Sequence, residues 1–344
     1  MCQPLLILGL ETSCDDTAAA VVQEGRTVLS SIVSSQDSFH LPFGGVVPEI
    51  ASRCHLEVIN TVIDEALRRA GATFSDLGGI AVSYGPGLVG SLLVGVSVAK
   101  GLAFTLDLPL IAVNHLEGHI YANFLTGATI AFPLLSLVVS GGHTSILYME
   151  DHGQIEVLGK TRDDAAGEVY DKIARELGLG FPGGPVLDRL AGGGNAAAFS
   201  FPRALMGEKG KLDFSFSGVK TAVLNCIHRE KEEKRQVNLA DIAASFQEAV
   251  VEALVGKSLQ AVRQKGTKQF LLAGGVAANS ELRKRLKQVL TLEGVELICP
   301  PVEYCTDNGA MVAAAGYYYL QQGRLAAWNL NAVPNLGFEP LKNK

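Results

Sequence analysis

Two histidines four positions apart, His115 and His119, have a spacing typical of metal ligands. On a helix this spacing places both imidazoles on one face, where they can bind one metal ion. Asp307 is the candidate for a third, oxygen ligand, and two imidazoles with one carboxylate leave coordination positions open for a substrate. The pair by itself fits equally well with histidines that cap a helix or pack in a core.

Glu117 bears on which kind of metal enzyme this could be. A zinc protease of the His-Glu-x-x-His type has its glutamate directly after the first histidine. Here Leu116 occupies that position, and the glutamate comes one residue later. We therefore expect Glu117 to point away from the metal-binding face. This position disfavours a metalloprotease. A metalloprotease would cleave a protein substrate, and a chelator would abolish the cleavage.

A turn rich in small residues follows an apolar, strand-like run in the second half of the chain. The run ends at Val138 and Val139, and the turn begins with Ser140, Gly141 and Gly142. Because these residues are small, the backbone can approach a phosphate or an acyl phosphate closely. A tight turn that binds nothing fits the same sequence.

Two acids and an asparagine are further binding candidates. Asp171 and Asp188 flank a second glycine turn, which contains Gly184. Carboxylates beside a nucleotide site commonly accept hydrogen bonds from ribose hydroxyls, although surface acids beside a loop fit as well. No side chain at 273–278 is larger than valine, so a base or ribose could lie there, with Asn279 supplying a donor and an acceptor.

The elements that must position these residues form two patterns, each of which occurs twice. An apolar strand, a polar turn and a second apolar strand occur at 5–22 and 134–149. A strand, a glycine turn and a helix-like stretch occur at 79–103 and 269–290, which is how an α/β sheet presents a phosphate to a helix N-terminus. The repetition predicts a duplicated α/β fold with a cleft between the copies.

The length predicts two domains, since 344 residues exceed the usual 150 per domain about twofold. We expect a first lobe at 1–130, a second lobe at 131–314, and a C-terminal segment, 315–344, that rejoins the first lobe. Hydrophobic residues make up 48% of the chain and charged residues 19%, with 38 glycines and 13 prolines. This composition excludes a disordered chain, a coiled coil and collagen.

Charge and apolar patterning restrict the partners and the compartment. The net charge is −6, whereas proteins that bind nucleic acid alone usually carry a basic surplus. A nucleic-acid substrate would therefore require a local basic surface or a basic partner. The apolar runs are too short to cross a bilayer, no signal peptide is evident, and six cysteines form no C-x-x-C pair. We expect a cytoplasmic protein with reduced thiols and no membrane partner.

In combination, the motifs resemble the bacterial tRNA adenosine threonylcarbamoyltransferase family, once labelled a sialoglycoprotein endopeptidase. The resemblance covers nearly the whole chain and rests on residues 9–17, 48–57, 84–87, 114–119, 140–144, 183–185, 214–220, 273–279 and 306–308. It implies an actin-like two-lobe fold of the ASKHA (ribonuclease-H-like) type with an interlobe cleft. It also implies transfer of threonylcarbamoyl from threonylcarbamoyl-adenylate to the exocyclic amine of the adenosine 3′ to the anticodon, in tRNAs that read codons beginning with A, with release of AMP.

The resemblance also assigns residues. It matches His115, His119 and Asp307 with the ligands of one divalent metal ion, Fe²⁺ or Zn²⁺, of which we favour Fe²⁺. The positions that hold the adenylate are matched by Val138, Val139, Ser140, Gly141, Gly142, Asp171, Gly184, Asp188 and Asn279. The base is not evident; His143 is a candidate, and a structural role in its turn is an open alternative.

The resemblance further implies partners: tRNA, a paralogous subunit of the TsaB type and a small ATPase of the TsaE type, bound partly through residues 48–57. Two other classes stay open. A kinase or acyl-phosphate ATPase on the same fold predicts Mg-dependent ATP turnover without a role for His115. A non-catalytic scaffold would lack the metal triad, so the presence of the triad argues against it.

Overall fold

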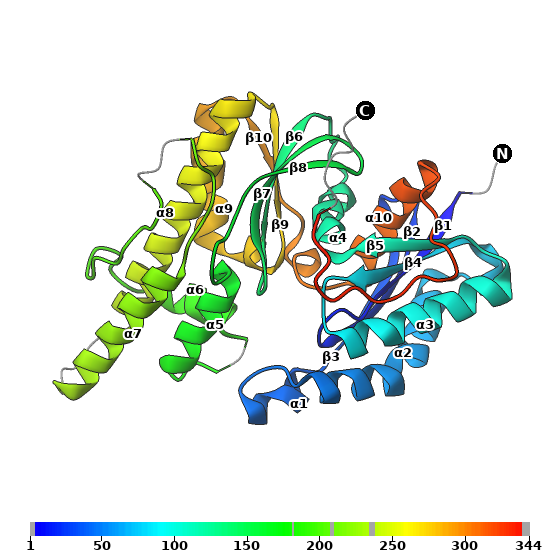
Figure 1. Cartoon of the computed structure of the whole chain (residues 1–344), viewed down its shortest axis with the longest axis horizontal. Coiled ribbons are helices and arrows are strands. Elements are labelled where there is room, and N and C mark those ends of the chain that lie inside the picture. The colour runs from blue at the N-terminus through cyan, green and yellow to red at the C-terminus, as the bar shows by residue number, and fades with distance from the viewer. Residues whose placement is uncertain (1–3, 181, 207–209, 234–237, 339–344) are drawn as a thin grey trace. The chain divides into compact units, whose positions relative to one another are not determined.

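The computed structural model describes residues 4–180, 182–206, 210–233 and 238–338. The chain divides into two compact units, residues 1–130 with 300–344 and residues 131–299. Each unit contains a five-stranded sheet (Figure 1). We describe each unit by itself.

The sheet of the first unit has the order β3-β2-β1-β4-β5. The strands are β1 (Leu6–Glu11), β2 (Asp16–Gln23), β3 (Thr27–Ser35), β4 (Leu77–Gly85) and β5 (Leu110–Asn114). The first three are antiparallel neighbours, whereas β1, β4 and β5 run parallel. Apart from the edge strand β3, which has one buried residue, the strands are buried almost throughout because helices cover both faces of the sheet.

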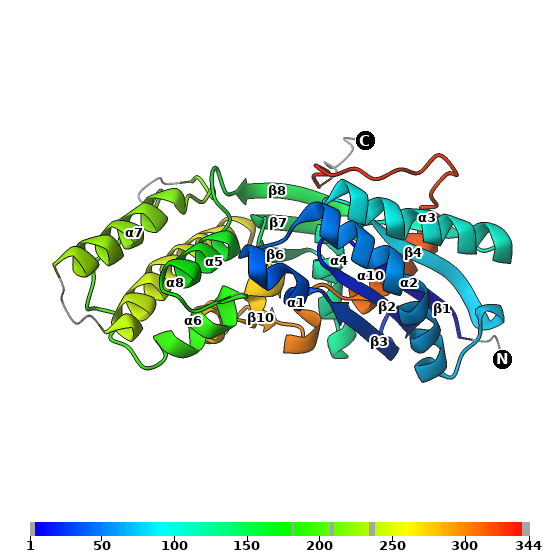
Figure 2. The ribbon, with the colours of Figure 1, turned by 90° about the horizontal axis from the view of Figure 1, so that it is seen from below.

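Two layers of helix cover this first sheet. Leu8 and Leu10 point to the face covered by α2 (Pro48–Ala70) and α3 (Val89–Leu106). Gly9 lies against the backbone of α10 (Gly309–Gln321) on the opposite face, where a Cβ would not fit. Figure 2 shows α2 and α3 together on one side of the sheet. The remaining short helices are α1 (Asp37–His40), α4 (His115–Tyr121), η1 (Leu41–Phe43), η2 (Phe74–Asp76), η3 (Ala122–Thr126) and η5 (Val302–Tyr304).

The sheet of the second unit has the order β10-β9-β6-β7-β8. Its strands are β6 (Leu134–Val139), β7 (Thr144–Asp151), β8 (Gln154–Lys160), β9 (Gln269–Ala273) and β10 (Glu296–Ile298). The helices of this unit are α5 (Ala166–Glu176), α6 (Gly183–Ala191), α7 (Ser217–Glu232), α8 (Leu239–Lys265), α9 (Ser280–Leu292) and η4 (Gly275–Ala278).

The two sheets repeat one topology. In each, a first strand pairs antiparallel with the second and parallel with the fourth, and the third strand continues the antiparallel side. Strands β1 to β5 thus correspond in order to β6 to β10. The predicted duplication of an α/β unit is confirmed.

The last part of the chain, residues 300–344, returns to the first unit and includes Asp307. The division by contacts assigns residues 300–344 to this unit, whereas the sequence-based division placed 300–314 in the second lobe. The reason is α10, which packs against β1, β2 and β4. Asp307 lies directly before α10 and therefore belongs to the same unit as the two histidines.

Helix α3 is long and apolar enough to cross a membrane, with a mean hydropathy of 1.7. The expectation of no membrane span rests on strand-like apolar runs, which do not include this helix. In the structure, Val94, Val96 and Ala99 of α3 are buried in the core that α2 and the sheet share. One face of α3 thus packs in the core of the unit, although only 39% of the helix is buried.

Candidate active site

Helix α4 presents both histidines, as the spacing predicted. The helix begins directly after β5, and Asn114 caps it, with Oδ1 accepting a hydrogen bond from the Leu116 N–H at 2.9 Å. The Nδ2 of Asn114 donates to the carbonyl of Gly337 at 2.8 Å. One side chain therefore fixes the start of α4 and ties it to the C-terminal segment of the same unit.

The structure brings His115, His119 and Asp307 together. One ligand atom from each residue lies within 4.8 Å of the other two. The Nε2 atoms of His115 and His119 lie 3.6 and 3.2 Å from Oδ1 of Asp307. Two imidazole nitrogens and a carboxylate oxygen are a donor set that suits Fe²⁺ or Zn²⁺. The Asp307 side chain is 24% exposed, so the group is reachable from solvent.

Two carboxylates lie beside His115, that of Glu11 at Nδ1 and that of Asp307 at Nε2. Burial lowers the pKa of His115, but the charges of Asp307 and Glu11 outweigh this effect and raise it to about 9. The pKa of Asp307 falls to about 2, because its interactions with the two histidines exceed the cost of burial. The pKa of Glu11 is lowered despite complete burial, since His115 lies beside it. A metal ion bound here would displace a proton from the group.

Glu117 does not join this group. It is buried, and its carboxylate accepts a hydrogen bond from the Tyr319 hydroxyl on α10. The expectation that Glu117 points away from the metal ligands is confirmed. The arrangement lacks the glutamate position that a zinc protease of this type requires.

In the second unit, hydrogen bonds within the turn hold the glycine turn between β6 and β7. The Ser140 N–H donates to the His143 carbonyl at 2.8 Å, and the His143 N–H donates to the Ser140 hydroxyl at 3.2 Å. Gly141 and Gly142 are exposed, with open space where a Cβ would stand. Val138 and Val139 are fully buried, so only their backbone could meet a ligand.

The N-terminal residues of helix α5 support this turn through hydrogen bonds. The Gly167 N–H donates to the Ser140 carbonyl at 3.2 Å, and the Ala166 N–H donates to the Thr144 hydroxyl at 3.0 Å. A Cβ on Gly167 would lie 2.5 Å from the Ser140 oxygen. The close approach therefore requires glycine at position 167.

The other predicted binding residues form two contacts in the second unit. Asn279 donates through Nδ2 to Asp188 Oδ1 at 3.1 Å, and its own Oδ1 caps α9. Asp171 Oδ1 accepts a hydrogen bond from the Gly183 N–H at 2.9 Å, at the start of α6. Gly184 and Asp188 share one face of α6, and no atom occupies the place of a Cβ on Gly184.

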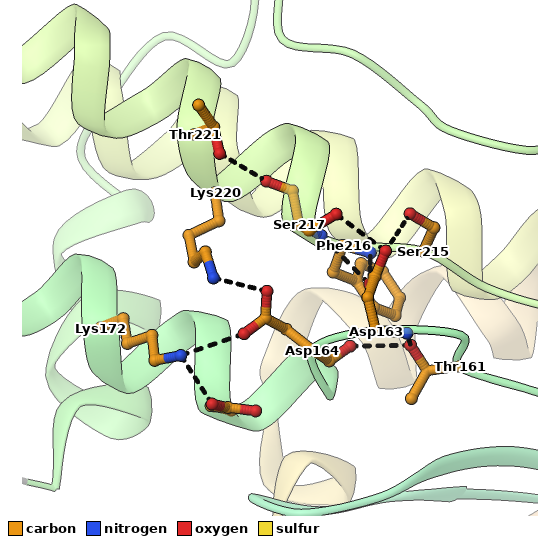
Figure 3. Close-up of polar contacts among 10 residues, drawn as sticks. Thr161, Asp163, Asp164, Lys172, Ser215, Phe216, Ser217, Lys220 and Thr221 are labelled. Carbon is orange, nitrogen blue, oxygen red and sulfur yellow. Dashed lines mark hydrogen bonds and ion pairs between the residues drawn. The ribbon is translucent and has the colours of Figure 1, made fainter.

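Two adjacent acids hold α5 and α7 in place (Figure 3). Asp163 accepts hydrogen bonds from the backbone N–H groups of Phe216 and Ser217, and thus caps α7. Asp164 accepts from Lys172 of α5 at 3.0 Å and from Lys220 of α7 at 2.6 Å. Both helices are therefore fixed to the loop that follows β8.

The family model described as tRNA N6-adenosine threonylcarbamoyltransferase matches residues 27–314, which include the triad and every predicted adenylate-binding position. A transferase so named from Desulfitobacterium hafniense (strain Y51) is 56% identical over 330 residues, 96% of each chain. One from Geobacillus thermodenitrificans (strain NG80-2) is 56% identical over 337 residues, 98% of each chain. The chain belongs to the tRNA N6-adenosine threonylcarbamoyltransferase family. It is accordingly a transferase.

Solved structures of low identity to this transferase agree with its fold. HypF of T. kodakarensis aligns with a TM-score of 0.61 at 17% identity, over 93% of this chain and 48% of that one. Component A of the (R)-2-hydroxyglutaryl-CoA dehydratase of Acidaminococcus fermentans aligns with a TM-score of 0.55 at 15% identity, over 92% and 99%. The predicted actin-like ASKHA fold is confirmed.

In each unit, further residues contact the predicted site residues, and they were not predicted from the sequence. Glu11, Ser13 and Ser83 contact His115 or one another, and Gln247 accepts a hydrogen bond from Asn279 at 2.8 Å. The polar turn after the first apolar strand was a signal for Glu11 and Ser13. Nothing in the sequence singles out Ser83 or Gln247.

Proposed function

We propose that the chain transfers the threonylcarbamoyl group from threonylcarbamoyl-adenylate to the exocyclic amine of the adenosine 3′-adjacent to the anticodon. The acceptors are tRNAs that read codons beginning with A, and AMP is released. The observation that carries this proposal is the convergence of His115, His119 and Asp307 in a chain of this transferase family.

In the proposed reaction the adenosine amine attacks the carbamoyl carbon of the mixed anhydride. A C–N bond forms, the bond from carbon to the phosphate oxygen breaks with its electron pair leaving on AMP, and the amine loses a proton. Because the anhydride is already activated, the enzyme must orient it, polarise its carbonyl and stabilise the departing phosphate. His143 is the candidate for the base.

We assign the adenylate to the second unit. The exposed turn at Gly141 and Gly142 would offer backbone N–H groups to the phosphate, with Val138, Val139 and Ser140 shaping the turn. The acids Asp171 and Asp188, with Gly184 and Asn279, would receive the ribose and the base. The open space over Gly184 supports this assignment.

We assign one divalent metal ion to His115, His119 and Asp307, with Fe²⁺ favoured and Zn²⁺ possible. An ion held there would supply Lewis-acid polarisation or a template for the substrate. The role of the chain is to hold three donors close together and leave one side open, which the exposure of Asp307 supports.

We also propose partners for the first unit. The net charge of −6 suggests that a partner completes the surface for tRNA. Phe39, Phe43 and Leu56 are 57%, 61% and 64% exposed, on α1, η1 and α2, beside or within residues 48–57. Exposed apolar side chains of this size are typical of a protein interface, which a TsaB-type subunit would cover, with a TsaE-type ATPase joining the assembly. We place the complex in the cytoplasm.

A transfer assay tests the proposed function. Purified protein is combined with threonylcarbamoyl-adenylate and unmodified tRNA, with and without the two partner proteins, and the nucleosides are analysed. We expect modified adenosine with the wild type and its loss with His115→Ala. No product in the presence of both partners would contradict the proposal and favour the kinase interpretation, which Mg-dependent ATP turnover would then support.

A further inference from the structure

Glu11 has no assigned role, yet its carboxylate is among the most completely enclosed charges of the first unit. The residue is 0% exposed at the end of β1. Its Oε1 accepts a hydrogen bond from the Ser13 N–H at 2.6 Å. Its Oε2 accepts from the Ser83 hydroxyl at 2.5 Å and contacts Nδ1 of His115 at 2.9 Å. A buried carboxylate is costly without such partners, so this arrangement requires an explanation.

The contact with Glu11 determines which nitrogen of His115 keeps its proton when a metal ion displaces the other one. An ionised carboxylate only accepts hydrogen bonds, so Nδ1 of His115 must be the N–H donor. A neutral imidazole has a single N–H, which leaves a lone pair on Nε2. That is the atom that faces Asp307, 3.6 Å from its Oδ1.

We propose that Glu11 is a positioning residue that orients His115 as a metal ligand and keeps Nε2 free to bind the ion. This inference rests on the proposed metal site and deepens it. Carboxylates that hold the second nitrogen of a metal-ligating histidine fix its tautomer and ring orientation and increase its basicity. Removing one weakens metal binding by about 10- to 100-fold.

The sheet itself holds this contact. Glu11 ends β1, Ser83 lies near the end of β4, and His115 follows β5 directly. These three strands are parallel neighbours, with Leu10 paired to Val82 and Ser83 paired to Val113. The carboxyl ends of parallel strands meet at one edge, so the carboxylate, its hydroxyl donor and the histidine are positioned by regular structure.

The other histidine provides an internal contrast. Nδ1 of His119 is buried and has no hydrogen-bond partner among the described residues. The Glu11 carboxylate therefore acts on one ligand of the pair. Ser13 supplies a matched control, because its hydroxyl lies 3.1 Å from the same Nδ1 of His115 but carries no charge.

The experiment measures Zn²⁺ affinity of the full chain by competition with a chromogenic chelator. We expect Glu11→Gln to bind Zn²⁺ about 10- to 100-fold more weakly than the wild type, and Ser13→Ala to lose less than about threefold. Circular dichroism confirms that each variant is folded. Equal Zn²⁺ affinity of folded Glu11→Gln and wild type would overturn the inference.

A second readout needs no variant, in case Glu11→Gln does not fold. In the Zn²⁺-loaded wild type, long-range ¹H–¹⁵N spectra assign the ring nitrogens of His115. We expect the proton on Nδ1 and the metal on Nε2. The opposite assignment would overturn the inference.

His115→Ala separates failure of the inference from failure of the metal site. If the wild type does not bind Zn²⁺, or His115→Ala binds it equally well, the proposed metal site is wrong, and the role of Glu11 falls with it. If His115→Ala loses Zn²⁺ and Glu11→Gln retains it at wild-type affinity, only the role of Glu11 is wrong.

Discussion

The two units share a strand order, but their corresponding turns carry opposite chemistry. Three buried or partly buried acids lie at the turn between β1 and β2: Glu11 ends β1, Asp15 lies in the turn, and Asp16 begins β2. The corresponding turn between β6 and β7 contains two exposed glycines and no acidic side chain. One topology thus carries a group of candidate metal ligands in one unit and an exposed glycine turn in the other, because turn residues determine function more than the fold does.

The pKa values of groups in and beside the first turn add to this contrast. Burial, together with the charges of Asp307 and Asp15, raises the pKa of Asp16 to about 7. Burial, together with the charges of Asp15 and Asp307, also raises the pKa of the Cys14 thiol. The first turn therefore lies in a negative field that disfavours anions, whereas the glycine turn offers backbone N–H groups.

The largest effect that tests this comparison is expected at Asp307. Asp307→Ala removes the oxygen ligand and leaves only two imidazoles of the three candidate metal ligands. We expect loss of bound metal and a decrease in transfer rate of at least about 100-fold. Glu303→Ala, an exposed acid of the same unit, is the control and should retain both. Metal content and nucleoside analysis measure the outcome; a metal-loaded, active Asp307→Ala would break the assignment of cation chemistry to the first unit.

The second unit is tested at Gly167. Gly167→Ala places a Cβ against the Ser140 carbonyl, so α5 or the glycine turn must shift. We expect AMP to bind at least about tenfold more weakly and the free energy of unfolding to fall by about 2 kcal/mol, while metal content stays unchanged. Calorimetric titration with AMP measures the affinity.

Gly218→Ala is the matched control for Gly167→Ala. Gly218 lies in α7 with open space around the place of a Cβ, so alanine should be neutral or stabilise the helix by up to about 1 kcal/mol. Wild-type AMP affinity in Gly167→Ala would contradict the assignment of the phosphate to this turn.

Asp164 tests whether the support of α5 is electrostatic. Burial raises the pKa of Asp164, but hydrogen bonds from Lys220 and Lys172 outweigh it and hold the pKa below its ordinary value of 3.8. A carboxyl group with a lowered pKa in the folded state stabilises the protein above its unfolded pKa, and this contribution is lost as the pH falls through the folded pKa. We expect Asp164→Ala to lose about 1.5 kcal/mol at pH 7, and the difference from wild type to shrink below pH 4.

Glu168→Ala provides the comparison for Asp164→Ala. Glu168 also pairs with Lys172, at 2.6 Å, but its side chain is 42% exposed. Exposed pairs of this helical spacing contribute about 0.3 to 0.5 kcal/mol. Urea denaturation at pH 7 and pH 3 measures both variants, and an equal loss at the two pH values for Asp164→Ala would show that packing, rather than charge, supports α5.

Local patterns in the sequence predicted the duplicated hairpins and the helical histidine pair, because alternation and spacing act over a few residues. Contacts between distant segments were not predictable. Asp163 caps a helix that begins 54 residues later, and Glu11 reaches His115 because β1, β4 and β5 are neighbours in the sheet. The unit to which Asp307 belongs also depended on the packing of α10, which no motif encodes.

The smallest predicted effects compare two capping asparagines, Asn114 in the first unit and Asn279 in the second. Each accepts a hydrogen bond from the backbone of its own helix, α4 or α9, and each donates a second bond through Nδ2. Replacing either residue with alanine should cost about 1 kcal/mol of unfolding free energy. The two variants should differ in which ligand they bind more weakly, because Asn114→Ala shifts the start of α4 and Asn279→Ala removes a contact of Asp188.

We therefore expect Asn114→Ala to weaken Zn²⁺ binding with AMP affinity unchanged, and Asn279→Ala to weaken AMP binding with Zn²⁺ affinity unchanged. Asn114→Asp is the control, because an aspartate retains the acceptor that caps α4 but loses the bond to Gly337. If Asn114→Asp binds Zn²⁺ like the wild type, the cap alone positions His115. If Asn114→Asp binds Zn²⁺ as weakly as Asn114→Ala, the C-terminal segment also holds the helix. If either alanine variant loses both Zn²⁺ binding and AMP binding, the division of chemistry between the units is wrong.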